Sequence, residues 1–91
     1  MTTIGFLGAG RMGTALVAAL CRTGRTVHVW NRTAEKAQAL AAFGARPERT
    51  PEAAVAAADI VMVNLLDYVA SDALFQRPEV TEALKGRLLV Q

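Results

Sequence analysis

Residues 3–16 read TIGFLGAGRMGTAL, and this stretch decides the fold. It opens with a short apolar run, Thr3 to Leu7, of the kind that forms a buried parallel strand. The run leads directly into a glycine-rich turn, Gly8-Ala9-Gly10-Arg11-Met12-Gly13, and then into apolar residues at helical spacing. A strand, a glycine turn and a helix in immediate succession indicate an α/β unit.

The turn matches the pattern G-x-G-x-x-G in the strand-turn-helix context that gives this pattern meaning. Gly8 permits the tight turn, Gly10 lets a pyrophosphate approach the backbone, and Gly13 lets the helix pack closely on the sheet. The phosphates would meet the free N–H groups at the start of the helix. We interpret the turn as a dinucleotide site, in which Arg11 either reaches the pyrophosphate or is exposed to solvent.

The rest of the chain continues the alternation of strands and helices. The sequence predicts a strand over Val27–Trp30, followed after Asn31-Arg32-Thr33 by an alanine-rich helix through about Ala42. It then predicts a helix starting at Thr50-Pro51-Glu52 and a strand over the apolar run 60–66. Helices over Val69–Phe75 and Glu79–Leu84 and a strand over Leu88–Val90 complete the pattern. This order predicts the α/β class, with a Rossmann-type doubly wound parallel sheet. Because a parallel sheet is rarely left uncovered, we expect the sheet to be truncated after its fifth strand.

Composition excludes several classes of function. The chain has 91 residues and a formal net charge of +2, too small an excess to indicate a nucleic-acid partner. A single cysteine, Cys21, cannot form an internal disulfide or hold a structural zinc alone. There is neither a signal segment nor an apolar run near the roughly 20 residues of a membrane helix. We therefore expect a cytoplasmic protein with no membrane partner and no metal site.

The end of the second strand indicates which dinucleotide is bound. An NAD site usually has an Asp or Glu here, which binds the ribose 2′-hydroxyl. This chain has Asn31, followed by Arg32 and Thr33, with Lys36 one helical turn further on. Without the carboxylate a 2′-phosphate is not repelled, and the guanidinium and hydroxyl can bind it. We predict NADP as the cofactor; the alternative is that these residues only shape the turn, with Thr33 capping the next helix, and Thr33 could do both.

Other reactive side chains are better explained by structure. His28 lies inside a strand and is expected to be hydrogen bonded there, Cys21 is expected to pack, and Trp30 is expected at the strand edge near the adenine end. Asp67 and Tyr68 follow a strand at the edge where ligands bind, although Asp67 could simply cap the next helix.

The segments GFLGAGRMGTAL, VHVWNRTAEKA and IVMVNLLD together resemble the N-terminal domain of the β-hydroxyacid dehydrogenase superfamily, which includes the 6-phosphogluconate dehydrogenase NADP-binding domain. The resemblance covers essentially the whole chain. It is greatest to the NADP-dependent branches, the imine reductases and the glyoxylate or succinic semialdehyde reductases. Leu66-Asp67-Tyr68 favours the imine reductases, because many hydroxyacid relatives have proline where Asp67 stands.

The resemblance implies a set of cofactor contacts. Gly8, Gly10, Arg11, Met12 and Gly13 would line the pyrophosphate, Asn31, Arg32, Thr33 and Lys36 would surround the 2′-phosphorylated ribose, and Leu65 and Leu66 would lie against the cofactor near its ribose groups. In such families a helical domain follows, dimerises and supplies the proton donors. Residues 1–91 would then be the NADP-binding part of a longer, homodimeric oxidoreductase, with no catalytic residue of their own.

The function implied is hydride transfer from NADPH to an imine or a small carbonyl or hydroxyacid substrate, with these 91 residues alone inactive. Three alternatives remain at this point. One is a pyrroline-5-carboxylate reductase-like enzyme, which has a similar glycine turn. Another is a stand-alone NADP-binding module that senses redox state or regulates a partner. The third is a purely structural α/β domain in which the glycine turn is fortuitous.

Overall fold

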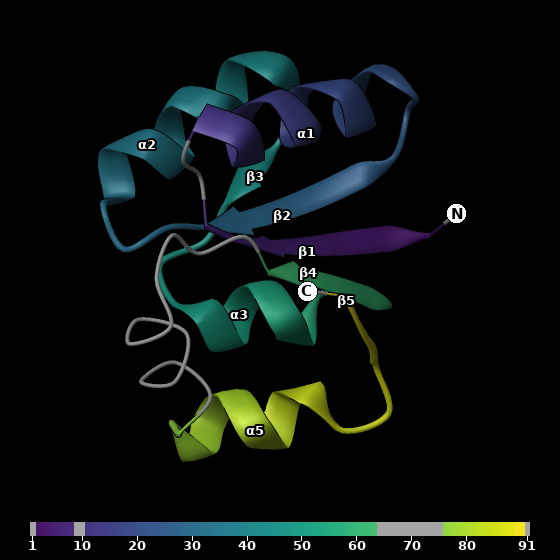
Figure 1. Cartoon of the computed structure of the whole chain (residues 1–91), viewed down its shortest axis with the longest axis vertical. Helices are drawn as coiled ribbons and strands as arrows, with labels where there is room; N and C mark the ends of the chain where they lie inside the picture. The colour runs from purple at the N-terminus through teal and green to yellow at the C-terminus, as the bar shows by residue number, and fades with distance from the viewer. Residues whose placement is uncertain (1, 9–10, 64–75, 91) are drawn as a thin grey trace.

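Parallel strands in the order β3-β2-β1-β4-β5 form the sheet of the described part of the chain (Figure 1). The computed structural model describes residues 2–8, 11–63 and 76–90, and of residues 11, 12 and 88–90 it describes only the backbone. In chain order the elements are β1 (Thr3–Leu7), α1 (Arg11–Arg22), β2 (Thr26–Trp30), α2 (Ala34–Ala39), the 3₁₀ helix η1 (Leu40–Phe43), β3 (Arg46–Pro47), α3 (Pro51–Ala56), β4 (Ile60–Val63), α5 (Pro78–Leu84) and β5 (Leu88–Val90). The strand order is that of the first five strands of a Rossmann sheet, which confirms the predicted fold class.

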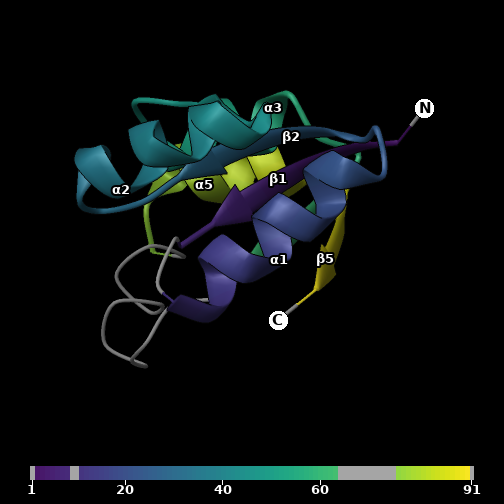
Figure 2. The same cartoon turned by 90° about the horizontal axis from the view of Figure 1, so that it is seen from above.

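Helices cover both faces of this sheet. In Figure 2 the pair α1 and α2 lies in front of the strands and α5 lies behind them. Helix α3 packs beside α5 on that second face. The order reverses direction between β1 and β4, and in open α/β sheets ligands bind at the carboxyl ends of the strands beside such a reversal.

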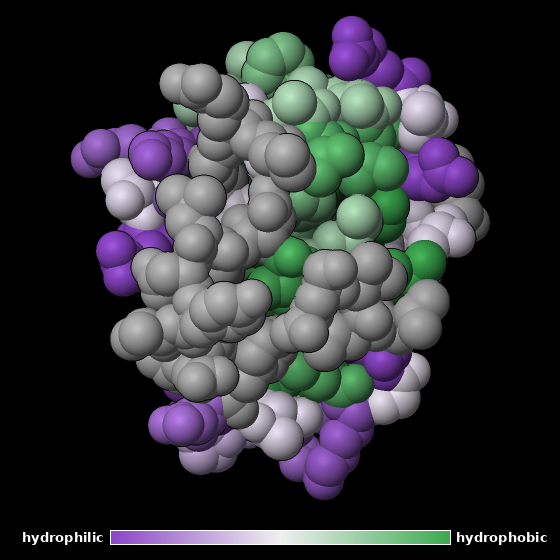
Figure 3. Space-filling model, in the orientation of Figure 1, coloured by the Kyte–Doolittle hydropathy of each residue, from purple (hydrophilic) through white to green (hydrophobic). Residues whose placement is uncertain are grey.

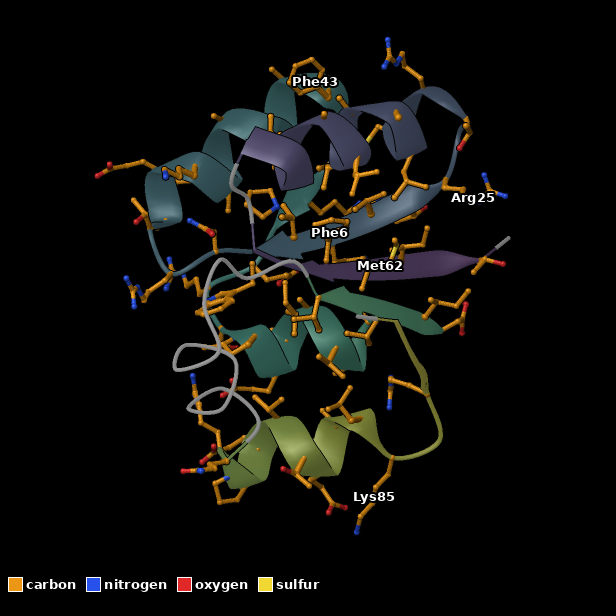
Figure 4. All side chains as sticks on the ribbon, viewed as in Figure 1. Phe6, Arg25, Phe43, Met62 and Lys85 are labelled. Atoms are coloured by element: carbon orange, nitrogen blue, oxygen red, sulfur yellow. The ribbon has the colours of Figure 1, made fainter. Side chains whose placement is uncertain are left out.

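The hydrophobic core is divided into two clusters by the sheet. Phe6 of β1 packs with Val17 of α1 and Val29 of β2 on one face, and all three are fully buried (Figure 4). Leu7 of β1 packs with Val55 of α3 on the other face. Successive side chains of a strand point to opposite faces, so the apolar run of β1 supplies both clusters.

Some apolar side chains of α1 and of the sheet face that α1 covers are exposed at the surface. Figure 3 shows hydrophobic side chains gathered over α1 and the strands beneath it. Leu16 is 39% exposed, while Leu20 and Met62 are only partly buried against the core. In the described part of the chain, α1 therefore covers this side of β4 incompletely.

Most predicted elements are present, with four departures. Strand β2 begins at Thr26, one residue earlier than predicted. The helix that was predicted to run to about Ala42 is α-helical only to Ala39 and continues as the 3₁₀ helix η1. Strand β3, only two residues long, was not located by the sequence pattern. The last described helix begins one residue earlier than predicted, at Pro78. The helix predicted over residues 69–75 lies outside the described residues.

Gly5 lets helix α3 approach the centre of β1. A Cβ atom at this position would lie 2.7 Å from the Ala54 carbonyl oxygen and 3.0 Å from the Ala58 Cβ. Backbone atoms cannot give way at such a distance without moving the helix. The absence of a side chain at Gly5 therefore sets the distance between the sheet and α3.

We expect Gly5→Ala to destabilise the protein by about 1–3 kcal/mol, as overpacking of a core does. Replacing a glycine by alanine at an unobstructed position with a compatible backbone instead stabilises a protein by about 0.4–1 kcal/mol. The sign of the change in the free energy of unfolding therefore shows whether the position is obstructed. Urea unfolding followed by circular dichroism measures the difference. A variant as stable as the parent protein would contradict the packing described for Gly5.

Arg87 joins the ends of two helices ahead of β5. Its guanidinium donates from Nε to the Ala58 carbonyl at 2.8 Å, and from Nη2 to the Ala56 carbonyl at 2.9 Å. Nη1 donates to the Ala83 carbonyl at 2.5 Å. These carbonyls lie at or just beyond the C-terminal ends of α3 and α5, where the partial charge of a helix is negative. One side chain therefore fixes the crossover into β5.

We expect Arg87→Ala to lower the free energy of unfolding by about 2 kcal/mol, because charge-assisted hydrogen bonds to carbonyls are lost. Lys85→Ala is the matched control, since its surface pair with Glu82 is highly exposed and such pairs contribute about 0–1 kcal/mol. Thermal and urea unfolding measure both variants. Equal effects of the two substitutions would show that Arg87 contributes no more than a surface charge.

Candidate dinucleotide-binding site

The ends of β1 and β2 are held together at the carboxyl edge of the sheet. Leu7 pairs with Trp30, and the Gly8 amide donates to the Trp30 carbonyl at 2.7 Å. Gly8 has φ = 108°, a left-handed conformation that favours glycine. The glycine turn therefore leaves β1 directly beside the point where Asn31 leaves β2.

The turn leads into helix α1, which begins at Arg11. Gly13 is buried in the first turn of α1, and its predicted packing against the sheet stays a prediction. Ala9 and Gly10 lie outside the described residues, as do the side chains of Arg11 and Met12. That these residues line a pyrophosphate stays a prediction.

The turn after β2 is closed by its own side chain. The Asn31 carboxamide donates from Nδ2 to the Thr33 carbonyl at 3.0 Å. Thr33 precedes α2 but makes no capping hydrogen bond through its side chain, so the predicted capping role of Thr33 is wrong. The same carbonyl of Thr33 accepts from the Lys36 amide at 3.2 Å. Backbone contacts and Asn31 organise this turn, and the Thr33 hydroxyl is not used for it.

Three side chains of this region face solvent: Arg32, Thr33 and Lys36. Within the residues that the structure describes, neither cation forms an ion pair and the Thr33 hydroxyl has no hydrogen-bond partner. The structure thus places Asn31 beside Gly8, with Arg32, Thr33 and Lys36 in the turn that follows Asn31 and in the first turn of α2. Leu65, Leu66, Asp67 and Tyr68 lie outside the described residues.

The other reactive side chains considered in the sequence, His28, Cys21 and Trp30, are engaged in contacts within the fold. His28 Nδ1 lies 2.7 Å from Glu48 Oε2, which agrees with the predicted hydrogen-bonded histidine of the sheet. Cys21 packs partly buried against the core cluster on the α1 face, and this burial raises the pKa of its thiol. A raised pKa disfavours the nucleophilic thiolate. Trp30 is partly buried against the cluster on the α3 face.

The described ranges contain no cluster of three or more His, Cys, Asp or Glu side chains suited to a metal ion. Within the same ranges no helix has the length and apolar character needed to cross a membrane.

Two residues at this edge were not singled out by the sequence: Glu48 and Arg49, which follow β3. A strand of two residues gives no periodic signal, so its exit could not be assigned to the edge. In the structure the Glu48 amide donates to the Val29 carbonyl at 2.8 Å, which brings this segment alongside the end of β2.

Known proteins similar to this chain match it over most of its length. Residues 3–91 match the family described as the NAD binding domain of 6-phosphogluconate dehydrogenase. The human cytokine-like nuclear factor N-PAC is 45% identical over 75 residues, which are 82% of this chain and 14% of that protein.

Solved imine reductases share the fold. The imine reductase from Myxococcus stipitatus in complex with NADP⁺ is 48% identical, with a TM-score of 0.92 over 100% of this chain. Its V8 variant in complex with NAD⁺ is 43% identical, with a TM-score of 0.95 over 100% of this chain. The chain spans 31% of each of these structures.

The match to the family extends over nearly all residues, and the structural likeness extends over all of them. The chain therefore belongs to the family of the 6-phosphogluconate dehydrogenase NAD-binding domain, and is an NAD(P)-binding domain of the kind found in imine reductases.

Proposed function

We propose that this domain binds NADP(H) in preference to NAD(H), and that the protein uses NADPH to reduce an imine or a small carbonyl substrate. The observation that carries the proposal is the turn after β2. Its carboxamide, Asn31, is bonded within the turn, while the guanidinium of Arg32 is exposed and has no anionic partner among the described residues.

The charges at this turn suit a phosphate better than a hydroxyl. A carboxylate at the end of β2 would accept a hydrogen bond from a ribose 2′-hydroxyl and repel a 2′-phosphate. Here the position holds a neutral carboxamide, and two exposed cations, Arg32 and Lys36, follow it. The exposed Thr33 hydroxyl adds a donor. Guanidinium and phosphate groups form strong, paired hydrogen bonds.

The fold alone does not select between the two cofactors. The two solved Myxococcus stipitatus structures, one with NADP⁺ and one a variant with NAD⁺, are both similar to this chain over its full length. The choice must therefore depend on side chains rather than on the path of the backbone. This supports assigning the preference to the turn at residues 31–33.

The contribution of this domain to the reaction is to hold and orient the cofactor. When bound, the nicotinamide supplies the hydride. The turn at Gly8 and the start of α1 would hold the pyrophosphate, with Gly10, Arg11, Met12 and Gly13 as its lining. Residues 31–33 and Lys36 would hold the 2′-phosphorylated ribose, with Leu65 and Leu66 near the ribose groups. We assign no catalytic role to any described side chain, and we propose that the proton donor lies in another part of a longer, homodimeric, cytoplasmic protein.

The similarity to N-PAC, which is named a nuclear factor, favours a second candidate. The domain could bind NADP(H) as part of a regulatory protein that does not reduce a substrate. Oxidation of NADPH in the presence of cyclic imines separates the two functions when it is followed by the absorbance of NADPH with the full-length protein at micromolar concentration, because this domain alone is expected to be inactive in both cases. Turnover supports the reductase; tight binding without turnover of any imine or carbonyl tested supports the regulatory protein.

We expect Arg32→Ala to weaken NADPH binding about tenfold or more while changing NADH binding less than about twofold, because a charge-assisted contact contributes about 1.5–3 kcal/mol. Arg25→Ala is the matched control: it removes the same charge from an exposed residue that precedes β2, at the opposite edge of the sheet (Figure 4). Calorimetric titration measures both cofactors. Equal losses for NADPH and NADH in Arg32→Ala would reject the assignment of the 2′-phosphate to this turn.

Asn31→Asp tests the neutral charge at the end of β2. The new carboxylate would repel a 2′-phosphate and could accept a hydrogen bond from a 2′-hydroxyl. We expect the ratio of NADPH to NADH affinity to fall at least about tenfold, which corresponds to about 1.4 kcal/mol. Asn31→Ser, which adds no charge, is the control. An unchanged ratio in Asn31→Asp would show that a ligand phosphate does not approach this position.

A further inference from the structure

A second guanidinium lies beside the turn at residues 31–33, on the neighbouring strand. Strands β2 and β3 are parallel, with His28 opposite Arg46 and Val29 opposite Pro47. The hydrogen bond from the Glu48 amide to the Val29 carbonyl extends this pairing beyond β3. Arg49 is the next residue, so its backbone leaves β3 about one strand spacing, roughly 4.8 Å, from the exit of β2.

The backbone at Arg49 is fixed from both sides. On one side the Glu48 carboxylate is held by His28, with 2.7 Å between Oε2 and Nδ1. On the other side the Thr50 hydroxyl caps α3 by accepting from the Ala53 amide at 3.2 Å. A residue between two anchored neighbours presents its side chain from a defined place, which a binding residue requires.

The charge of Arg49 is not compensated by the protein. Its side chain is exposed and forms no ion pair within the described part of the chain. The two acidic residues nearest to it in sequence already make contacts of their own: Glu48 Oε2 lies 2.7 Å from His28 Nδ1, and Glu52 Oε2 lies 3.1 Å from Arg77 Nη2. Like charges on Arg49 and Arg32 repel each other, and an anion bound at this edge relieves that repulsion.

We propose that Arg49 is a further specificity-determining residue, which binds the adenosine 2′-phosphate together with Arg32. The proposal rests on the function proposed above. The 2′-phosphate is then held from the exits of two adjacent strands, by Arg32 beyond β2 and Arg49 beyond β3. A dianionic phosphate has enough oxygen atoms to accept hydrogen bonds from both guanidinium groups.

The test compares two adenosine ligands that differ in this phosphate. Adenosine 2′,5′-bisphosphate and adenosine 5′-monophosphate are titrated into the parent protein and into the variants Arg49→Ala, Arg46→Ala and Arg32→Ala. Arg46 is the matched control because it is an exposed arginine on the same short strand, paired with His28 further from the edge. We expect Arg49→Ala to weaken bisphosphate binding about threefold to tenfold, with monophosphate binding changed less than about twofold, a size typical of one partly screened charge-assisted contact. Arg46→Ala should change neither ligand more than about twofold.

The outcomes separate this proposal from the one on which it rests. If Arg32→Ala loses bisphosphate binding selectively and Arg49→Ala does not, the role of Arg49 is overturned and the NADP preference stands. If the parent protein binds both adenosine ligands equally, the NADP preference itself fails. Arg49→Gln, which removes the charge and keeps a polar side chain with the same aliphatic stem, replaces Arg49→Ala if circular dichroism shows that the alanine variant does not fold.

Discussion

The hydrogen bond from the Gly8 amide to the Trp30 carbonyl, 2.7 Å long, is the contact on which the candidate site depends. It fixes the start of the glycine turn against the end of β2, so the two segments that we propose for the phosphates and for the ribose are held side by side. The bond requires the chain to turn at φ = 108°, a conformation that residues with a Cβ adopt only at a cost in free energy. Gly5 acts in the same strand for a different reason, because it leaves room for the backbone of α3.

Sequence patterns were sufficient to predict those elements of the fold whose signal lies in adjacent residues. The apolar run of β1, the glycine turn and the start of α1 are adjacent in the chain, so their order alone predicts a dinucleotide fold. The cap of α3 was also predictable, because Thr50, Pro51 and Glu52 occupy the positions that such residues prefer. The cofactor-binding contacts of the individual residues stay predictions.

The remaining features depend on partners far away in sequence. Strand β3 is too short to show a period, and its exit is fixed by the contact between His28 and Glu48, 20 residues apart. Arg87 contacts carbonyls 29 and 31 residues before it. Thr33 and Thr50 both precede helices, yet only Thr50 caps its helix through the side chain, since Asn31 already closes the other turn. No local pattern distinguishes these two threonines.

We propose that a few side chains at one edge of the sheet select the phosphorylated cofactor. Calorimetric titration of the unmodified protein with NADPH and with NADH, at low and at moderate salt, measures this selection. We expect NADPH to bind at least about tenfold more tightly, by about 1.4 kcal/mol, and this advantage to decrease as salt screens the exposed cations. Equal affinities, or tighter binding of NADH, would contradict it.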